Sequence, residues 1–273
     1  MGYKLHLEDL MIDIHNHILP GLDDGAKDIE TTIEYLKLIQ ESGVKKLVFT
    51  PHYMPGFYES THKAVSSIFK DIMKIKDDYA PDVHFYHSAE VYLNGENIID
   101  DIIKENLFIN NSQYVLVENN LNGFTEDLYQ LLYQMTRKGM KPILAHPERY
   151  QEIKENPIKA DDFLQRDVYL QINTGSILGG YGKQVQDTAF ELIDRGWVHF
   201  LGSDCHCRSM VYDFPEAVDA IRHEFDNKMA ELLSQTFPEK MLNNEHLPHF
   251  YMVRKETPKK KSFLEKMLDF FGE

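Results

Sequence analysis

Residues 10–17, "LMIDIHNH", place an apolar run directly before two histidines that stand one residue apart. In a β-strand, side chains at i and i+2 point to the same side, so His15 and His17 would project together from the end of a short strand. Imidazole nitrogens bind a metal ion at about 2.0–2.1 Å, and this spacing lets two rings reach one cation. The stretch "LGSDCH" at 201–206 repeats the spacing with Asp204 and His206.

Short apolar runs alternate with amphipathic helical stretches along most of the chain. Each run is rich in Val, Ile, Leu and aromatic residues, which is typical of buried parallel strands. The expected strands are 10–14, 46–50, 83–87, 113–117, 141–145, 168–172 and 197–201. The expected helices run from a cap at Asp28 to Gly43, from a cap at Thr125 to Gly139, and over 59–78, 184–195 and 214–236. Seven strands that alternate with helices favour an α/β barrel over an open sheet.

Histidines and acidic residues follow six of the seven expected strands. Because the carboxyl ends of barrel strands surround one mouth, these side chains converge there although they are far apart in sequence. They are His15 and His17 after the first strand, His52 after the second, Glu90 after the third, Glu118 after the fourth, His146 after the fifth, and Asp204 and His206 after the seventh. The pattern predicts a metal centre, and its mixed nitrogen and carboxylate donors suit Mn, Fe or Zn.

Each of these residues also has an ordinary structural interpretation. A single histidine after a strand is more often a core or capped residue than a ligand, and Glu90 alone is compatible with a helix N-terminal carboxylate. Asp23 or Asp24 beside Gly25 is typical of a turn, and Asp204 is compatible with a helix N-cap. The metal interpretation therefore rests on the combined pattern rather than on any one residue.

The composition narrows the class of protein. The chain has 273 residues, 42% hydrophobic and 27% charged, which suits a single α/β barrel domain. Its net charge of −15 argues against nucleic acid as a partner, because phosphate backbones are met by basic patches. The two cysteines, Cys205 and Cys207, form no disulfide framework, and the N-terminus has no apolar targeting segment, so we expect a cytoplasmic protein.

The ordered motifs "DIHNHILPGLDDG", "TPH", "SAEVYL", "AHPERY" and "GSDCH" resemble the polymerase and histidinol phosphatase (PHP) family. They are most similar to its bacterial branch of manganese-dependent tyrosine-protein phosphatases from capsule and exopolysaccharide clusters. The resemblance covers about residues 10–245 and implies a distorted (β/α)7 TIM-like barrel with three divalent metal ions, Mn²⁺ before Fe or Zn. It predicts one PHP phosphatase domain over residues 1–250.

The resemblance also implies a role for each site residue. His15, His17, Glu90 and Asp204 would hold one metal; Glu90 would bridge to a second, held also by Glu118 and His146; and Asp24, His52 and His206 would hold the third. Arg149, in "HPER", stands at the position that the family uses to grip phosphate. Arg208 is the nearest candidate for a further family arginine, with a surface salt bridge as the alternative. A metal-bound hydroxide would attack phosphorus, with His52 or His206 available to protonate the leaving group.

The implied substrate is phosphotyrosine on a protein, in particular on a membrane-associated bacterial tyrosine autokinase. Tyr53, Phe57 and Tyr58 would form an aromatic wall for the phenyl ring, with ordinary loop packing as the alternative. The competing functions are a histidinol-phosphate phosphatase, a PHP nuclease and a metal-binding module without catalysis. A cysteine-based phosphatase is disfavoured, because no arginine stands six positions after Cys205 or Cys207.

The C-terminal part of the chain has a different composition. The segment "RKETPKKKS" at 254–262 is basic, and Ser262 and Glu265 have the spacing of a helical capping box. We expect residues 251–273 to form a basic segment and a short amphipathic helix. That helix would dock on the barrel or on a neighbouring subunit, or would contact a membrane surface weakly. The sequence leaves the oligomeric state open.

Overall fold

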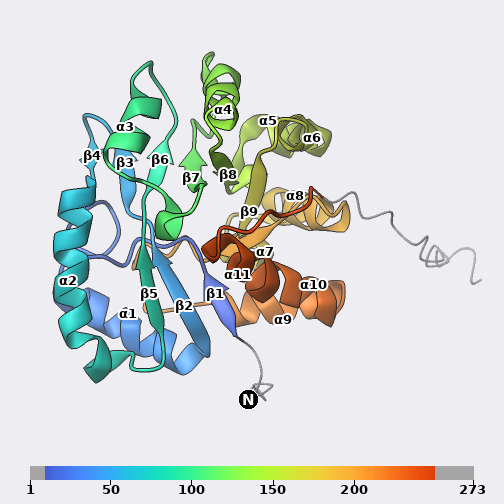
Figure 1. The fold of residues 1–273 in the computed structure, drawn as a ribbon. Helices are drawn as coiled ribbons and strands as arrows, with labels where there is room; N and C mark the ends of the chain where they lie inside the picture. Colours follow the sequence, from blue (N-terminus) through green and yellow to red (C-terminus); the bar gives the residue numbers. More distant parts are fainter. Residues whose placement is uncertain (1–9, 250–273) are drawn as a thin grey trace, which may run out of the picture.

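The structure is a computed structural model that describes residues 10–249. Strands and helices alternate along this part of the chain (Figure 1). The strands are β1 (Met11–Asp13), β2 (Val44–Phe49), β3 (His52–Met54), β4 (Tyr58–Glu59), β5 (His84–His87), β6 (Glu90–Tyr92), β7 (Tyr114–Glu118), β8 (Lys141–Ala145), β9 (Tyr169–Asn173) and β10 (Phe200–Gly202). The α-helices are α1 (Ile29–Ser42), α2 (His62–Tyr79), α3 (Ile98–Lys104), α4 (Leu128–Arg137), α5 (Gln151–Glu155), α6 (Asp161–Leu164), α7 (Thr174–Ile177), α8 (Lys183–Asp194), α9 (Phe214–Glu224), α10 (Asn227–Glu231) and α11 (Phe237–Leu242). Short 3₁₀ helices are η1 (Ile109–Asn111), η2 (Pro147–Arg149) and η3 (Pro157–Ala160), and η4 (Leu232–Thr236) is a π-helix.

The strands occupy seven parallel positions around the barrel wall, called staves below, and two of these staves are each made of two successive strands. One sheet has the order β1-β2-β5, and the other has the order β10-β9-β8-β7-β6-β3, with β4 added as an antiparallel hairpin strand. The chain passes from β2 to β3 and from β5 to β6 within a few residues, so each pair continues one stave. Backbone bonds from Ser88 N to Phe49 O (2.8 Å) and from Glu90 N to Pro51 O (3.1 Å) join these two staves where the sheets change.

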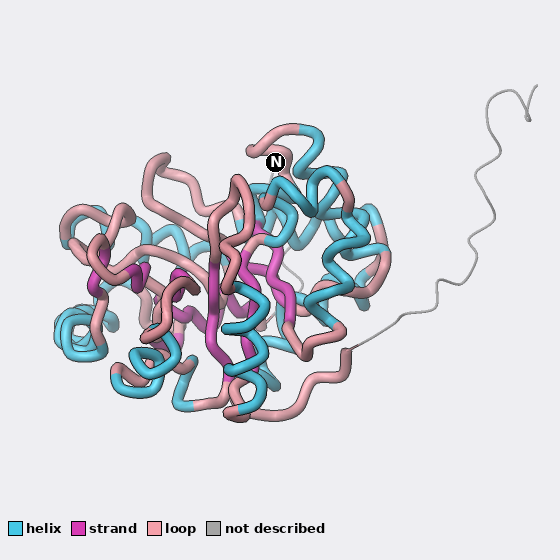
Figure 2. The backbone as a smooth tube through the Cα atoms, turned by 90° about the horizontal axis from the view of Figure 1, so that it is seen from above, coloured by secondary structure: helices cyan, strands magenta, loops and turns pink. Residues whose placement is uncertain are grey.

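The barrel closes between its first and last staves. Just beyond β1 and β10, Asn16 and Cys205 form an isolated parallel bridge. Asp204 N donates to His15 O (2.8 Å), and His17 N donates to Cys205 O (2.9 Å). Figure 2 shows the helices lying around the strands when the molecule is viewed from above. The expected distorted (β/α)7 barrel is therefore confirmed, and its distortion lies in the two interrupted staves.

Local sequence signals explain where several helices begin and end. The Asp28 side chain caps α1 by accepting a hydrogen bond from Thr31 N, and Gly43 ends the helix with a left-handed φ of 87°. The buried face of α1 carries Tyr35, Leu36 and Ile39, which have the spacing expected of an amphipathic helix.

Three expectations about helices were wrong. Thr125 does not cap α4, because its Oγ1 accepts from Asn119 Nδ2 (2.8 Å) and the helix begins at Leu128. The helix expected over 59–78 begins later, capped by Thr61, because β4 occupies Tyr58–Glu59. The helix expected over 214–236 is divided into α9, α10 and η4, and Asp226 caps α10 after the break.

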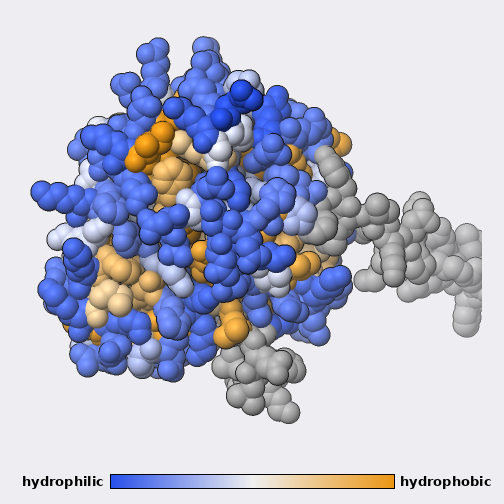
Figure 3. All heavy atoms as spheres, in the orientation of Figure 1, coloured by the Kyte–Doolittle hydropathy of each residue, from blue (hydrophilic) through white to orange (hydrophobic). Residues whose placement is uncertain are grey.

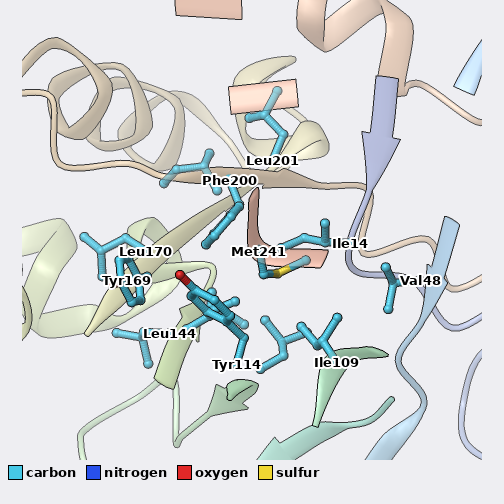
Figure 4. Packing of buried hydrophobic residues seen from close by; sticks show 14 of the residues in the cluster. Ile14, Val48, Ile109, Tyr114, Leu144, Tyr169, Leu170, Phe200, Leu201 and Met241 are labelled. Carbon is cyan, nitrogen blue, oxygen red and sulfur yellow. The ribbon is translucent and has the colours of Figure 1, made fainter. Parts of the chain in front are cut away.

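The barrel interior below the strand ends is filled with apolar side chains. Ile14, Val48, Tyr114 and Leu144 come from different staves and surround one space, in which Met241 of α11 lies (Figure 4). Full burial of side chains of this size stabilises a fold by about 1.5–3 kcal/mol each. This packing fixes the staves and therefore the positions of the residues at their carboxyl ends.

The outer surface is mainly hydrophilic on the face shown in Figure 3, with separate apolar areas. Between residues 10 and 249, no helix combines the length and the apolar character that crossing a membrane requires. The basic segment and amphipathic helix expected at 251–273 lie outside the described residues, as do residues 1–9 and residue 250 of the domain expected over 1–250.

Candidate metal centre

The candidate ligands from six of the seven staves meet at one mouth of the barrel. β9 contributes none of them, as the sequence indicated. They are His15 and His17 just past β1, Asp24 in the following loop, His52 on β3, Glu90 on β6, Glu118 on β7, His146 just past β8, and Asp204 and His206 just past β10. The third expected strand does not carry Glu90 directly, because β5 ends at His87 and Glu90 begins β6.

His15 and His17 form the centre of the cluster. Their Nε2 atoms are 3.2 Å apart. Glu90 Oε2 lies 3.2 Å from His15 Nε2 and 3.4 Å from His17 Nε2. Asp204 Oδ1 lies 3.5 and 3.4 Å from the same two nitrogens. The two imidazoles and Asp204 form one group whose donor atoms lie within 4.8 Å of one another, and Glu90 Oε2 approaches the same two nitrogens; all four residues are buried.

The hydrogen-bond partners of the two Nδ1 atoms determine which nitrogen of each ring carries the hydrogen. His15 Nδ1 lies 2.8 Å from Gln171 Oε1, and His17 Nδ1 lies 2.7 Å from Asp23 Oδ2. These oxygens only accept hydrogen bonds, so both Nδ1 atoms carry hydrogen and each neutral ring keeps its lone pair on Nε2. Gln171 Nε2 donates to Asn173 Oδ1 (2.9 Å), which fixes the direction of the amide. Two Nε2 lone pairs and two carboxylate oxygens thus face one another, and this donor set fits a cation.

The electrostatics of the group lead to the same conclusion. Burial disfavours the charged ring of His17, but hydrogen bonds to Asp204, Asp23 and Glu90 raise its pKa well above the ordinary value. Burial also opposes ionisation of Glu90, yet His15 and His52 hold the pKa of that carboxyl well below its usual range. The carboxylates are therefore charged, and positive charge belongs among them, as protons or as metal ions.

A second group, His52, Glu90 and Glu118, lies beside the first, and its Glu90 Oε2 also contacts His15 and His17. His52 Nδ1 is 3.1 Å from Glu90 Oε2 and 3.0 Å from Glu118 Oε1. His146 Nε2 is 3.0 Å from Glu90 Oε1 and 3.9 Å from Glu118 Oε2. Burial lowers the tendency of His52 to be charged, but Glu90 and Glu118 raise its pKa to about 10. Glu90 thus lies between the two groups, and its role as a bridge between two metals stays a prediction.

A third group occupies the more exposed side of the mouth. Donor atoms of His17, Asp24, His52 and His206 lie within 4.8 Å of one another. Asp24 Oδ1 is 3.3 Å from His206 Nε2 and 3.6 Å from His52 Nε2. Arg208 Nη2 donates to Asp24 Oδ2 (2.6 Å), and its side chain is 70% exposed. Arg208 therefore forms a salt bridge at the rim, the alternative that the sequence had left open.

The grouping differs in part from the ligand sets that the family resemblance implied. His52 belongs to two of the groups within 4.8 Å, one with Glu90 and Glu118 and one with Asp24 and His206. His146 belongs to none of these groups, although its Nε2 lies 3.0 Å from Glu90 Oε1. The implied division into three metals remains a prediction.

Arg149 lies at the edge of the cluster on η2. Its Nη1 donates to Asp204 Oδ2 (2.9 Å), which also accepts from Asn173 Nδ2 (2.6 Å). Its guanidinium carbon stands 4.4 Å from the centre of the Tyr181 ring. Burial disfavours the charge, but Asp204 more than offsets it and raises the pKa of Arg149, so the guanidinium stays a cation.

The backbone at the mouth is closely constrained. His146 and Asp204 have left-handed φ values of 39° and 50°, conformations that L-residues adopt rarely and that concentrate at functional sites. A Cβ atom at Gly25 would stand 1.9 Å from His17 O, and one at Gly202 would stand 2.6 Å from His15 Cβ. Glycine is therefore required where these segments pass behind the two central histidines.

The sequence did not identify several residues that hold the ligands in place. Asp23 accepts from His17 Nδ1, from His52 N (2.8 Å) and from Gly25 N (3.0 Å). Asp13 is buried and accepts from Ser203 N and from Tyr212 Oη, both at 2.9 Å. Asp13 could have been identified from the sequence, because it is an aspartate within an otherwise apolar strand. The roles of Asp23, Gln171 and Tyr181 depend on contacts across the barrel and had no local signature.

The aromatic wall expected after β2 is only partly present. Tyr53 is 6% exposed and belongs to the core, so it cannot line the mouth. Phe57, at the turn of the β3–β4 hairpin, is 81% exposed. The Tyr58 ring stacks on the His52 imidazole, with centroids 5.6 Å apart. Alternation along β3 explains the outcome, because neighbouring residues His52 and Tyr53 must face opposite sides.

Comparison with known proteins identifies relatives over most of the chain. The family model described as capsular polysaccharide synthesis, CpsB/CapC, matches residues 11–243. The tyrosine-protein phosphatase YwqE of Bacillus subtilis is 32% identical over 239 residues, which are 86% of this chain and 92% of YwqE. The tyrosine-protein phosphatase CpsB of Streptococcus pneumoniae is 27% identical over 238 residues, which are 85% of this chain and 98% of CpsB.

Solved structures show the same relationship. A structure from work on YwqE and CpsB, described as unique metal-dependent tyrosine phosphatases, matches with a TM-score of 0.79 at 30% identity, covering 88% of this chain and 97% of that one. A histidinol phosphate phosphatase of Lactococcus lactis matches with a TM-score of 0.53 at 15% identity over 81% of this chain and 94% of the other, and so shares the fold. The family match, the barrel and the whole-length similarity agree, and this chain belongs to the CpsB/CapC family of capsular polysaccharide synthesis.

Proposed function

We propose that this protein is a metal-dependent protein-tyrosine phosphatase that acts on phosphotyrosyl proteins of capsule or exopolysaccharide synthesis. The observation that carries the proposal is the cluster of histidines and carboxylates beside Arg149, in a chain similar over most of its length to YwqE. Hydrolysis of a phosphate monoester requires positive charge around the phosphoryl oxygens and a positioned water molecule. The residues at this mouth are suited to supply both.

The clustered side chains would hold divalent metal ions, and we propose three of them, with Mn²⁺ preferred and Fe or Zn as alternatives. When bound, such ions lower the pKa of water and neutralise phosphoryl oxygens. The protein itself directs the ligands toward them. Asp23 and Gln171 take the Nδ1 hydrogens of His17 and His15, and each ring thereby presents Nε2.

Arg149 is the proposed phosphate-binding residue. Its guanidinium carries a fixed positive charge at the edge of the cluster, and Asp204 tethers it through Nη1. A planar guanidinium can give two parallel hydrogen bonds to phosphoryl oxygens, which a lysine ammonium cannot match in geometry. Substitution of Arg149 by Lys would therefore keep the charge and lose the bidentate contact.

Departure of the phenol needs little assistance, because a phenol has a pKa of about 10 and phenolate is a moderate leaving group. His52 and His206 are the groups proposed to give a proton where one is needed. Nε2 of each ring faces Asp24 Oδ1 on the exposed side of the mouth. Arg208 would act at the same rim, where it holds the other oxygen of Asp24.

We further propose that the phosphotyrosyl partner is a membrane-associated bacterial tyrosine kinase and that the protein works in the cytoplasm. Two features support this view. Cys205 and Cys207 are both free thiols, as expected in a reducing compartment. Phe57 and Tyr58 give the β3–β4 hairpin an aromatic edge next to His52, where the phenyl ring of a substrate can rest.

The test is phosphate release from a phosphotyrosyl peptide by the full chain, after chelation and again after addition of Mn²⁺. Histidinol phosphate is assayed in parallel, because the Lactococcus lactis histidinol phosphate phosphatase shares the fold. We expect Mn²⁺ to restore turnover of the peptide and not of histidinol phosphate. Turnover of histidinol phosphate alone would refute the proposal and assign the same mouth to a small-molecule substrate.

A further inference from the structure

A glycine-rich loop brings an aromatic ring to the edge of the candidate metal centre. Residues 178–182, "LGGYG", connect α7 to α8. Gly179 and Gly182 have left-handed φ values of 81° and 91°, which allow the loop to turn sharply on either side of Tyr181. A Cβ atom at Gly175 would stand 3.2 Å from Tyr181 Cε2, so the ring lies directly against the first turn of α7.

Tyr181 is exposed to solvent and also contacts the proposed phosphate-binding arginine. The guanidinium carbon of Arg149 stands 4.4 Å from the ring centre, the range of a cation–π contact. Tyr181 is 44% exposed as a residue, so it combines a contact with Arg149 and an exposure to solvent. Burial, together with the nearby carboxylate of Asp204, raises the pKa of Tyr181, so its hydroxyl stays neutral beside the cluster.

Arg149 is held in two directions by these contacts. Asp204 Oδ2 accepts one N–H of the guanidinium at 2.9 Å and fixes one edge. The Tyr181 ring covers one face and restricts rotation of the plane. A bidentate contact with a phosphoryl group requires a defined plane, because both N–H bonds must point at the same two oxygens.

We infer that Tyr181 is a positioning residue, whose aromatic ring holds the Arg149 guanidinium in the plane that binds the phosphoryl group. The inference deepens the proposed function and rests on it. The ring is the required feature, because its face makes the contact to Arg149, whereas the hydroxyl interacts with Asn173. A purely structural role for Tyr181 would instead support the loop alone and would not depend on Arg149.

The test compares four single variants of the full chain and one double variant. Tyr181→Leu removes the ring, and Tyr181→Phe keeps it without the hydroxyl. Leu178→Ala is the matched control, because Leu178 is an exposed apolar residue of the same loop. Arg149→Ala and the double variant Tyr181→Leu with Arg149→Ala complete a double-mutant cycle, which measures coupling between the two side chains.

We expect Tyr181→Leu to lower kcat/KM for the Mn²⁺-restored phosphotyrosyl peptide by roughly tenfold, the size of a partly desolvated cation–π contact. Tyr181→Phe and Leu178→Ala should remain close to wild type. In the Arg149→Ala background the leucine substitution should have almost no further effect. Equal losses in the two backgrounds, or a phenylalanine variant as impaired as the leucine variant, would overturn the inference.

Binding of inorganic phosphate gives a second readout that does not require turnover. The dissociation constant of phosphate is measured by titration calorimetry on the Mn²⁺-loaded proteins. We expect Tyr181→Leu to weaken phosphate binding by roughly the same tenfold factor and Tyr181→Phe to leave it unchanged. If wild type fails to hydrolyse the peptide, the proposed function fails while phosphate binding still tests Tyr181. Absence of phosphate binding to wild type, or equal affinities of wild type and Tyr181→Leu, would overturn the inference itself.

Discussion

The replacement of Asp23 by Asn is expected to weaken metal binding without unfolding the barrel. The side chain of Asp23 is buried and accepts three hydrogen bonds, from His17 Nδ1 (2.7 Å), His52 N (2.8 Å) and Gly25 N (3.0 Å). Oδ2 takes the first two bonds and Oδ1 takes the third. An asparagine has one oxygen only, so its amide group must face at least one of these donors.

The size of the expected loss in Mn²⁺ affinity follows from the most favourable orientation of the asparagine side chain. Its oxygen keeps His17 and His52, and its amide nitrogen faces Gly25 N. The remaining bonds change from charge-assisted to neutral, a difference of about 1–2 kcal/mol, and Gly25 N loses its partner. About 1.4 kcal/mol corresponds to tenfold, so we expect Mn²⁺ to bind about 10–100-fold more weakly, as is common when the partner of a metal-bound histidine is altered.

The assay is competition between the metal-free protein and a chelating dye for Mn²⁺. Asp71→Asn, at an exposed position of α2, is the control for loss of one negative charge. We expect the control to bind like wild type and Asp23→Asn to recover most of its phosphatase activity at saturating Mn²⁺. An Asp23→Asn variant with wild-type Mn²⁺ affinity would refute the reasoning that Asp23 fixes the His17 ring.

Three further predictions concern the close contact between Gly25 and His17, the stability of the fold in acid, and the two cysteines. Gly25→Ala should abolish metal binding measured with the same dye, because its Cβ would stand 1.9 Å from His17 O; retained binding would contradict this. Burial lowers the pKa of His199 to about 3 in the folded protein, whereas an unfolded histidine has a pKa of about 6.5. As pH falls below about 6.5, the unfolded chain therefore binds a proton at His199 that the folded protein does not, and the free energy of unfolding decreases. In urea unfolding with chelator, wild type should lose about 2 kcal/mol more than His199→Gln between pH 6.5 and 5, and parallel losses would contradict the assignment. The double variant Cys205→Ala with Cys207→Ala should keep phosphatase turnover with Mn²⁺, whereas loss of turnover with intact folding would reinstate a cysteine role.

The candidate ligands were visible in the sequence because two rules act together, one local and one that follows from the barrel. Side chains at i and i+2 share one face of a strand, which pairs His15 with His17 and Asp204 with His206. The carboxyl ends of parallel barrel strands gather at one mouth, which brings His146 to Glu90 from 56 positions away. The cap of α1 at Asp28 was equally readable, because an N-cap depends on neighbours within one helical turn.

Other features were decided only by tertiary structure. The breaks between β2 and β3 and between β5 and β6, which place these strands in two sheets, were not predicted from the sequence. The side chain of Tyr53 faces the core because His52, its neighbour on β3, faces the mouth. The division of the helix expected over 214–236 is the exception, because the cap by Asp226 on Met229 N is a local signal that the sequence analysis did not use.

Strand periodicity and strand order predicted the class of barrel and the histidines and carboxylates that follow its strands, whereas Asp24 and Arg149 were assigned from the family resemblance. Tertiary structure decided which donors share a point, which oxygen holds each imidazole, and that Tyr181 lies on Arg149, 32 positions earlier. The physical reason is the range of the interactions. Periodicity and caps act within a few residues, whereas hydrogen bonds and ring contacts across a barrel exist only after the staves have packed.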